Sequence, residues 1–135
     1  MTALDTNVLV RFLVRDDEKQ SRAVYARLKR AEADRESLFV PLLVVLETIW
    51  VLESAYGQSR PEILNALDHL TEMPVFEFEK LGVLQSLATE ARKSTADLSD
   101  LLLAVTATSC GCDGMLTFDK KAAKHPFFRL LTSDL

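Results

Sequence analysis

Residues 38–57, LFVPLLVVLETIWVLESAYG, contain the pattern that decides the fold of this chain. The short apolar run Leu38–Val40 predicts a β-strand, and Pro41 stands where a helix begins. The apolar stretch that follows predicts a helix running to about Tyr56 and stopping at Gly57. A buried strand followed directly by a helix is the unit from which parallel α/β folds are built.

Glu47 interrupts this apolar helix. The side chains one helical turn away are Leu43, Val44, Trp50 and Val51, so we expect Glu47 to be buried and Trp50 to belong to the core. A buried carboxylate is costly unless it is paired, protonated or bound to a metal. Glu47 therefore points to a functional site, although a buried, hydrogen-bonded carboxylic acid is an alternative.

Three further acids stand at predicted junctions between strands and helices: Asp5, Asp100 and Asp119. Four convergent carboxylates would repel strongly, at roughly 4 kcal/mol for one pair about 4 Å apart at an effective dielectric near 20. A divalent cation would offset this repulsion, because carboxylate oxygens suit hard cations. The alternative for each Asp is a helix cap, and this alternative is strongest for Asp97 and Asp100 at one helix start.

The rest of the chain alternates short strands with amphipathic helices. Beyond 38–40, we expect a short buried strand at 2–4 and further strands at 75–78, 115–118 and 128–131. We expect helices at 7–14, from a capping box at 17–20, from a second capping box at 59–62, at 81–91 and at 101–110. This order predicts an α/β three-layer sandwich with a central, mainly parallel, short-stranded sheet flanked by helices. We expect a single domain over residues 1–135, with its working crevice at the carboxyl ends of the strands.

Composition narrows the class of protein. A chain of 135 residues with 48% hydrophobic content is globular. Its net charge is −4, and the charges other than those of the four acids sum to zero. The net charge is therefore compatible with a nucleic-acid partner. Its apolar runs are too short to span a bilayer, and no signal peptide is evident. Cys110 and Cys112 are too close in sequence for a typical bridge, so we expect free thiols and a cytoplasmic protein.

Four ordered segments carry a family resemblance. LDTNVLVR at 4–11, the helical Glu47, ADLSD at 96–100 and TFDK at 117–120 resemble PIN-domain proteins, and most closely the VapC toxins of bacterial and archaeal toxin–antitoxin pairs. The resemblance covers the whole chain and implies a PIN-like parallel sheet. It also implies a Mg²⁺- or Mn²⁺-dependent endoribonuclease, usually a homodimer, whose acidic groove is filled by the tail of a cognate VapB-like antitoxin.

The resemblance assigns roles by position in this chain. It implies that the catalytic acids are Asp5, Glu47, Asp100 and Asp119, and that the metal ligands among them are Asp5, Asp100 and Asp119. It implies supporting roles for Thr6, Asn7, Asp97 and Thr117. For contacts to RNA phosphates we expect Arg11, Arg15 and Lys120, with a solvated polar face as the alternative for each of them.

Other functions fit the pattern less well. A receiver-type signalling domain would place its phosphorylated Asp near residue 50, where the apolar helix stands, and a haloacid-dehalogenase-like phosphatase needs an Asp where Asn7 stands. A non-catalytic PIN-like protein that binds only RNA or an antitoxin is the main alternative. The RNA target is left open among transfer, ribosomal and messenger RNA.

Overall fold

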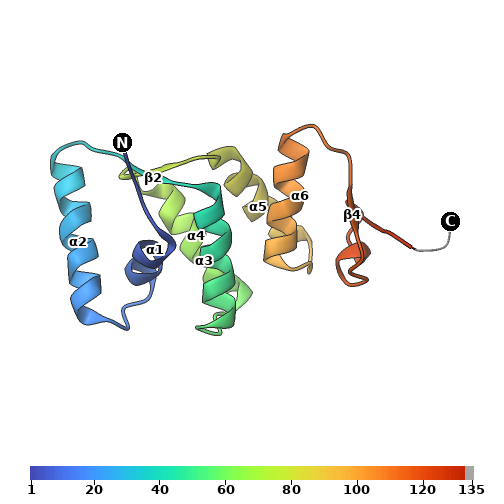
Figure 1. The fold of residues 1–135 in the computed structure, drawn as a ribbon, viewed down its shortest axis with the longest axis horizontal. Coiled ribbons are helices and arrows are strands. Elements are labelled where there is room, and N and C mark those ends of the chain that lie inside the picture. Colours follow the sequence, from blue (N-terminus) through green and yellow to red (C-terminus); the bar gives the residue numbers. More distant parts are fainter. Residues whose placement is uncertain (133–135) are drawn as a thin grey trace. The chain divides into compact units, whose positions relative to one another are not determined.

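The computed structural model describes residues 1–132 (Figure 1). The chain forms two compact units, one over Met1–Leu81 and one from Gly82 onward. Short parallel strands and longer helices alternate along the chain, which confirms the predicted α/β class with its parallel strands flanked by helices. The prediction of one domain over residues 1–135 stays a prediction.

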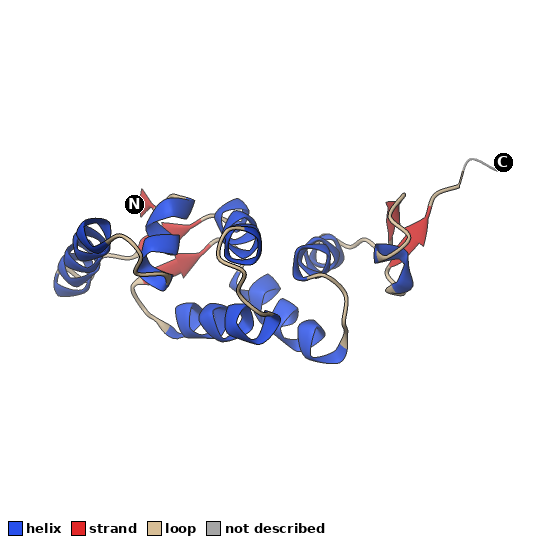
Figure 2. Cartoon of the chain, turned by 90° about the horizontal axis from the view of Figure 1, so that it is seen from below, coloured by secondary structure: helices blue, strands red, loops and turns tan. Residues whose placement is uncertain are grey.

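The first unit is built on a three-stranded parallel sheet in the order β1-β2-β3 (Figure 2). In this sheet Thr2 pairs with Leu38, and Leu38 pairs with Phe76. Helix α1 packs against both α2 and α3. The elements of this unit are β1 (Thr2–Ala3), α1 (Thr6–Leu13), α2 (Glu18–Ala33), β2 (Leu38–Val40), α3 (Leu42–Ser54), α4 (Arg60–Glu72) and β3 (Phe76–Phe78).

Helix starts in this unit follow the predicted caps. The Asp17 side chain accepts a hydrogen bond from the Gln20 N–H at the start of α2. Ser59 and Glu62 form a reciprocal capping box at the start of α4. After α3, Gly57 has a φ of +59°, a left-handed conformation that glycine adopts without strain. Helix α3 itself ends at Ser54, two residues before the predicted end.

The core of the first unit lies between its sheet and its helices. Branched side chains from β2, α3 and α4 are fully buried there, namely Leu38, Val40, Ile49, Leu52, Ile63 and Leu70. Strand β1 was expected to be buried along its length, and this expectation is wrong: Thr2 and Ala3 are exposed and only the following Leu4 is buried. The reason is that β1 pairs with β2 alone, at the edge of this sheet.

The second unit carries a two-stranded parallel sheet, β4 and β5, in which Met115 pairs with Phe128. The expected fifth strand is therefore confirmed. Helix α6 contributes Ala104 to a small core with Ala122 and Phe128. The elements are α5 (Leu81–Lys93), which begins at the boundary between the units, α6 (Leu98–Ser109), β4 (Met115–Thr117), the 3₁₀ helix η1 (Ala122–Lys124) and β5 (Phe128–Leu130).

Two further observations concern the whole described chain. Within residues 1–132, no helix combines the length and the apolar character needed to cross a membrane. Cys110 and Cys112 are free, as expected from their spacing, and both are exposed.

Candidate functional site

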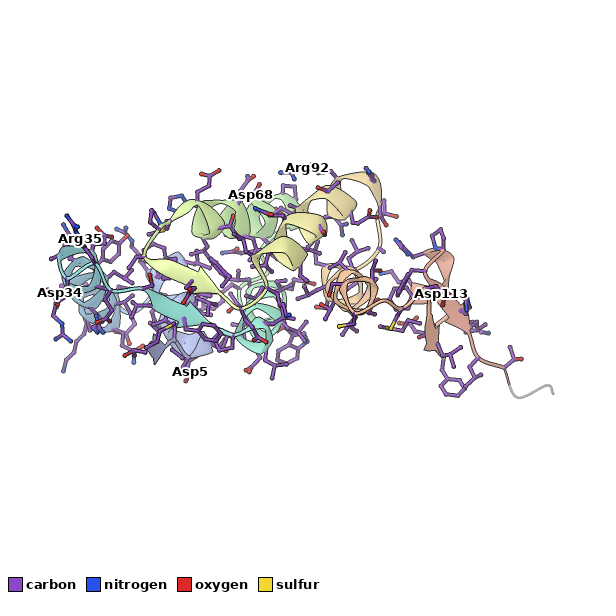
Figure 3. All side chains as sticks on the ribbon, turned by 90° about the horizontal axis from the view of Figure 1, so that it is seen from above. Asp5, Asp34, Arg35, Asp68, Arg92 and Asp113 are labelled. Carbon is purple, nitrogen blue, oxygen red and sulfur yellow. The ribbon has the colours of Figure 1, made fainter. Side chains whose placement is uncertain are left out.

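Asp5, labelled in Figure 3, occupies the turn between β1 and α1. Its Oδ1 accepts a hydrogen bond from the Thr6 N–H at 2.7 Å, so it is the N-cap of α1, and this bond does not use its Oδ2. The neighbouring Thr6 is buried, and its Oγ1 has no hydrogen-bond partner among residues 1–132. Asn7 is exposed. The cap therefore fixes the backbone on which a free carboxylate oxygen is presented.

Glu47 is not buried, which corrects the expectation from sequence. It lies on an exposed face of α3 between Leu43 and Trp50, which are 72% and 64% exposed, so the expectation that Trp50 belongs to the core is also wrong. The opposite face carries Ile49 and the buried polar residue Thr48, whose hydroxyl donates to the Val44 carbonyl at 2.7 Å. The reason is helix register, since residues 43, 47 and 50 share one face of a helix.

Asp97 and Asp100 lie together at the start of α6. The Asp97 side chain accepts hydrogen bonds from the N–H groups of Ser99 and Asp100, at 2.9 and 3.4 Å, and is therefore the N-cap. The pKa of the Asp100 carboxyl is raised above its ordinary value, first by partial burial and then by the negative charges of Asp97 and Asp119, while Lys121 opposes the shift. Asp97 and Asp119 thus each repel Asp100 within one unit.

Asp119 follows β4 and is held on two sides. Its backbone N–H donates to Thr117 Oγ1 at 3.0 Å, and its Oδ1 accepts from the N–H groups of Lys121 and Ala122, at 2.8 and 3.3 Å. Thr117 thus positions the backbone of Asp119 directly, and its supporting role in the site stays a prediction. The Asp119 carboxylate itself caps the short turn that leads into η1.

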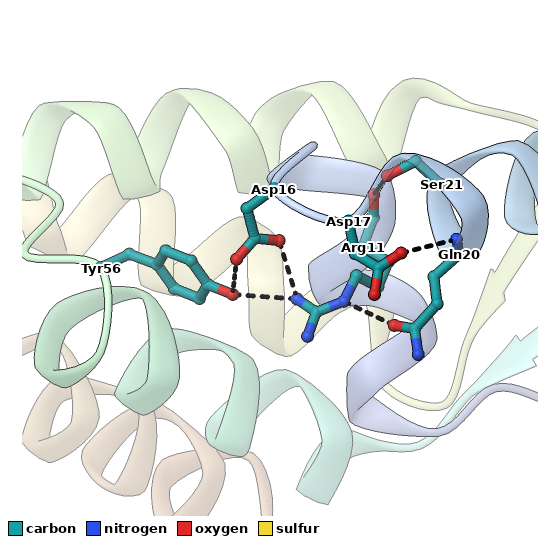
Figure 4. Close-up of polar contacts among 6 residues, drawn as sticks. All are labelled: Arg11, Asp16, Asp17, Gln20, Ser21 and Tyr56. Atoms are coloured by element: carbon teal, nitrogen blue, oxygen red, sulfur yellow. Dashed lines mark hydrogen bonds and ion pairs between the residues drawn. The ribbon is translucent and has the colours of Figure 1, made fainter.

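Arg11 stands at the centre of a polar network in the first unit (Figure 4). Its Nε donates to Gln20 Oε1 at 2.7 Å, and its Nη1 donates to Asp16 at 3.1 Å and to the Tyr56 hydroxyl at 2.9 Å. Tyr56 in turn donates to Asp16 at 2.8 Å. The hydrogen bond to Tyr56 and the charge of Asp16 outweigh desolvation and raise the pKa of Arg11. This network ties α1 to α2 and to the segment after α3.

The two other predicted RNA contacts are more accessible. Arg15 is exposed, donates to the Tyr25 hydroxyl, and holds its guanidinium carbon 4.6 Å from the centre of the Tyr25 ring. Lys120 is exposed and directly follows Asp119. Arg15 and Lys120 thus present charge at the surface, whereas most donors of Arg11 are already used.

The predicted acids are divided between the two units. Asp5 and Glu47 belong to the first unit, and Asp97, Asp100 and Asp119 belong to the second. Within residues 1–132, no three His, Cys, Asp or Glu side chains are grouped closely enough to hold a metal ion. The metal-binding set Asp5, Asp100 and Asp119 therefore stays a prediction.

One residue with a clear role in the structure was missed by reasoning from sequence. Tyr56 closes the Arg11 network, and no local signal marks it, because the contact spans 45 positions. Lys121, one of the lysines that follow Asp119, donates its N–H to Asp119 and opposes the rise in the pKa of Asp100.

Comparison with known proteins decides the family. The family model described as PIN domain matches residues 2–127, which include segments of both units. The chain belongs to the PIN-domain family. This PIN-domain protein is also similar to a protein of Aquifex aeolicus (strain VF5) named VapC ribonuclease, with 26% identity over 127 residues, 94% of this chain and 93% of the relative. The family resemblance read from the four sequence segments is thereby confirmed.

Proposed function

We propose that this PIN-domain protein is a metal-dependent endoribonuclease that acts as the toxin of a toxin–antitoxin pair. The family match over residues 2–127 is the observation that carries the proposal, and the similarity to a VapC ribonuclease supports it. The geometry of the second unit adds to this support. Local hydrogen bonds hold the turns that carry Asp100 and Asp119, and Asp119 is near enough to raise the pKa of Asp100.

The proposed cation is Mg²⁺ or Mn²⁺, and the donor set fits either of them. The proposed ligands Asp5, Asp100 and Asp119 offer only carboxylate oxygens, which these hard cations prefer. The pKa of Asp100 is raised by burial and by the charges of Asp97 and Asp119, so a positive ion at this place would relieve repulsion. What a bound cation supplies is a more acidic water molecule and positive charge for the phosphoryl group.

The side chains of this chain perform the remaining tasks in the proposal. Asp5 keeps Oδ2 available while Oδ1 caps α1, and Asp119 keeps its place through Thr117 and the turn after β4. Glu47, exposed on α3, orients the attacking water. In-line attack on the phosphodiester then leaves a 5′-phosphate and a 3′-hydroxyl.

Supporting roles follow from the local contacts. Asp97 fixes the first turn of α6 and thereby the backbone of Asp100. Thr6 and Asn7 organise the turn that carries Asp5. Arg15 and Lys120 contact RNA phosphates, and Arg11 does so through Nη2, the amino group that its network leaves unused within residues 1–132.

The proposed partners complete this function. A VapB-like antitoxin inhibits the enzyme by placing its tail against the acidic residues, and the active form is a cytoplasmic homodimer. The exposed apolar residues Leu43 and Trp50 on α3 are compatible with burial in a dimer. RNA single strands or loops are the preferred substrate, because their backbone can splay into a groove.

The experiment that tests the proposal is cleavage of total RNA by the purified chain, with mapping of the new ends. We expect Mn²⁺- or Mg²⁺-dependent cuts that carry 5′-phosphates, no cuts in excess EDTA, and no cuts by the Asp119→Asn variant. RNA binding without turnover under any divalent metal would instead identify a non-catalytic PIN-like binder. Undiminished cleavage in EDTA would refute the metal-dependent mechanism.

A further inference from the structure

A cavity in the second unit is lined by none of the proposed catalytic acids. It encloses about 560 Å³, within the range of roughly 300–1,000 Å³ that is common for ligand sites. Lysines reach it from two separate segments: Lys93 from the last turn of α5, and Lys121 and Lys124 from the region of η1. Glu90 is the one acid among its described lining residues.

The three lysines form no ion pair within residues 1–132, although several other basic residues do, including Arg11, Arg22 and Arg27. All three lysines are exposed. Glu90 lines the same cavity, and Lys121 lies near enough to Asp100 to affect its pKa. Three lysines against one lining acid leave the cavity with a net positive charge, and a bound anion reduces the repulsion among the lysines. The charge of the cavity therefore favours a negatively charged group.

His125 adds an oriented neutral donor to the same cavity. Its Nδ1 accepts a hydrogen bond from the Phe127 N–H at 3.2 Å. A neutral imidazole that accepts at Nδ1 carries its proton at Nε2, so Nε2–H is left as a donor. Edge-to-face packing of the imidazole on the Phe128 ring, with centres 6.1 Å apart, holds this orientation.

The lysine cavity is connected to the proposed catalytic acids through the backbone. Lys121, which lines the cavity, donates its N–H to Asp119 Oδ1 at 2.8 Å. An anion in the cavity is therefore bound beside the turn that carries Asp119. A polymer with regularly spaced anionic groups can occupy both places at once, whereas a small anion occupies only one.

We propose that this cavity binds a backbone phosphate of the RNA strand, neighbouring the phosphodiester that is cleaved. Lys93, Lys121 and Lys124 neutralise the phosphate, and His125 Nε2–H donates to one of its oxygens. The inference rests on the proposed function, since it assigns a second contact to the same substrate. An acidic peptide is the less suitable occupant, because its charges sit on flexible side chains without the regular spacing of a phosphate backbone.

The test is binding of a short, fluorescently labelled single-stranded RNA to the full chain, measured by anisotropy in excess EDTA at several salt concentrations. For the triple variant Lys93→Ala, Lys121→Ala, Lys124→Ala we expect affinity to fall by about 10-fold or more. The slope of log affinity against log salt should become shallower by about 0.7 for each phosphate that the variant no longer neutralises. The corresponding triple Lys→Arg variant should keep most of the affinity.

A matched control removes the same charge elsewhere. The variant Lys19→Ala, Lys29→Ala, Lys80→Ala changes three exposed lysines outside the cavity and should bind RNA nearly as the original chain does. Circular dichroism checks that both variants are folded, and the single change Lys124→Ala replaces the triple variant if that variant is not. In steady-state cleavage we expect the double variant Lys93→Ala, Lys124→Ala, which leaves Lys121 and its effect on Asp100 in place, to raise KM and leave kcat unchanged.

The outcomes separate this inference from the proposed function. Equal loss of affinity in the cavity and control variants, or loss of polyglutamate binding with RNA binding intact, would overturn the inference. Metal-dependent cleavage by the original chain, together with an RNA affinity and a KM that do not change in the cavity variant, would overturn the inference too. That result would leave the nuclease proposal standing. Cavity-dependent RNA binding without any cleavage would support the inference and remove the nuclease proposal.

Discussion

The two units of this PIN-domain protein differ in how their charged side chains are bonded. In the first unit Arg11 is bound by Asp16, Gln20 and Tyr56, so its charge serves to connect helices. In the second unit Asp100 is crowded by other carboxylates, and the lysines of the cavity form no ion pair within residues 1–132. The difference teaches that the charge of Arg11 is used to connect helices of the first unit, whereas Asp100 and the cavity lysines of the second unit are available to bind ligands.

The largest expected effect, and the strongest test of this comparison, is the loss of activity in two matched variants, one in each unit. Asp5→Asn in the first unit and Asp100→Asn in the second should each reduce RNA cleavage by at least about 100-fold, more than the loss of an outer-shell partner costs. Asparagine keeps the shape and, at position 5, the helix cap. Initial rates with Mn²⁺ measure the effect. Full activity in the Asp5 variant would mean that the first unit is only a scaffold.

Truncation of one core residue in each unit tests whether the units unfold together. Ile49→Ala and Leu101→Ala remove fully buried side chains, and each should lower the free energy of unfolding by about 2–5 kcal/mol. Urea denaturation followed by circular dichroism should give one transition in both variants, as for a single domain. Leu43→Ala, at a highly exposed position, is the control and should change little. Two separate transitions would contradict the single-domain prediction.

The Arg11 network can be tested through the two tyrosines of the chain. Tyr56→Phe removes a hydroxyl that accepts from Arg11 and donates to Asp16, and we expect the melting temperature to fall by about 3–5 °C. Tyr25→Phe removes a hydroxyl that accepts only from the exposed Arg15 and should have a smaller effect. Equal falls in melting temperature would show that the Arg11 network stabilises the first unit no more than the exposed contact between Arg15 and Tyr25 does.

The smallest expected effect is a pH dependence that originates in the second unit. Because the folded-state pKa of Asp100 is raised, first by burial and then by Asp97 and Asp119, the folded chain retains this proton longer than the unfolded chain. Without metal, stability should therefore fall as pH rises from the ordinary carboxyl range through the folded-state pKa. Melting curves of Asp100→Asn should lack this contribution and give a slightly more stable protein at neutral pH. An unchanged pH profile would contradict the crowding of Asp100.

Much of the fold could be predicted from sequence because its signals are local. Caps such as Asp17 and Ser59 mark helix starts through their own hydrogen bonds, and Gly57 marks the turn after α3. The same holds for Asp5 and Asp97, whose alternative role as helix caps is confirmed, whereas Asp119 accepts hydrogen bonds within the turn before η1. These features depend on a few neighbouring residues and need no knowledge of packing.

The face of α3 could not be predicted in this way. Its residues are apolar nearly all round, so hydrophobic periodicity does not distinguish the side of Ile49 from the side of Trp50. Glu47 was consequently assigned to the interior, although Thr48 is the polar residue that is buried there. Which face turns inward is set by tertiary contacts with α1, which is distant in sequence, and with α4.

Trp50 has one further consequence. It is the sole tryptophan of the chain and is 64% exposed, so its indole emission reports on a single place on α3, beside Glu47. Anything that covers this helix face, whether a second copy or an inhibitor, should shift the emission to shorter wavelength and protect it from iodide quenching. The molecule thus contains its own optical reporter for occupancy of the surface around Glu47, with no label attached.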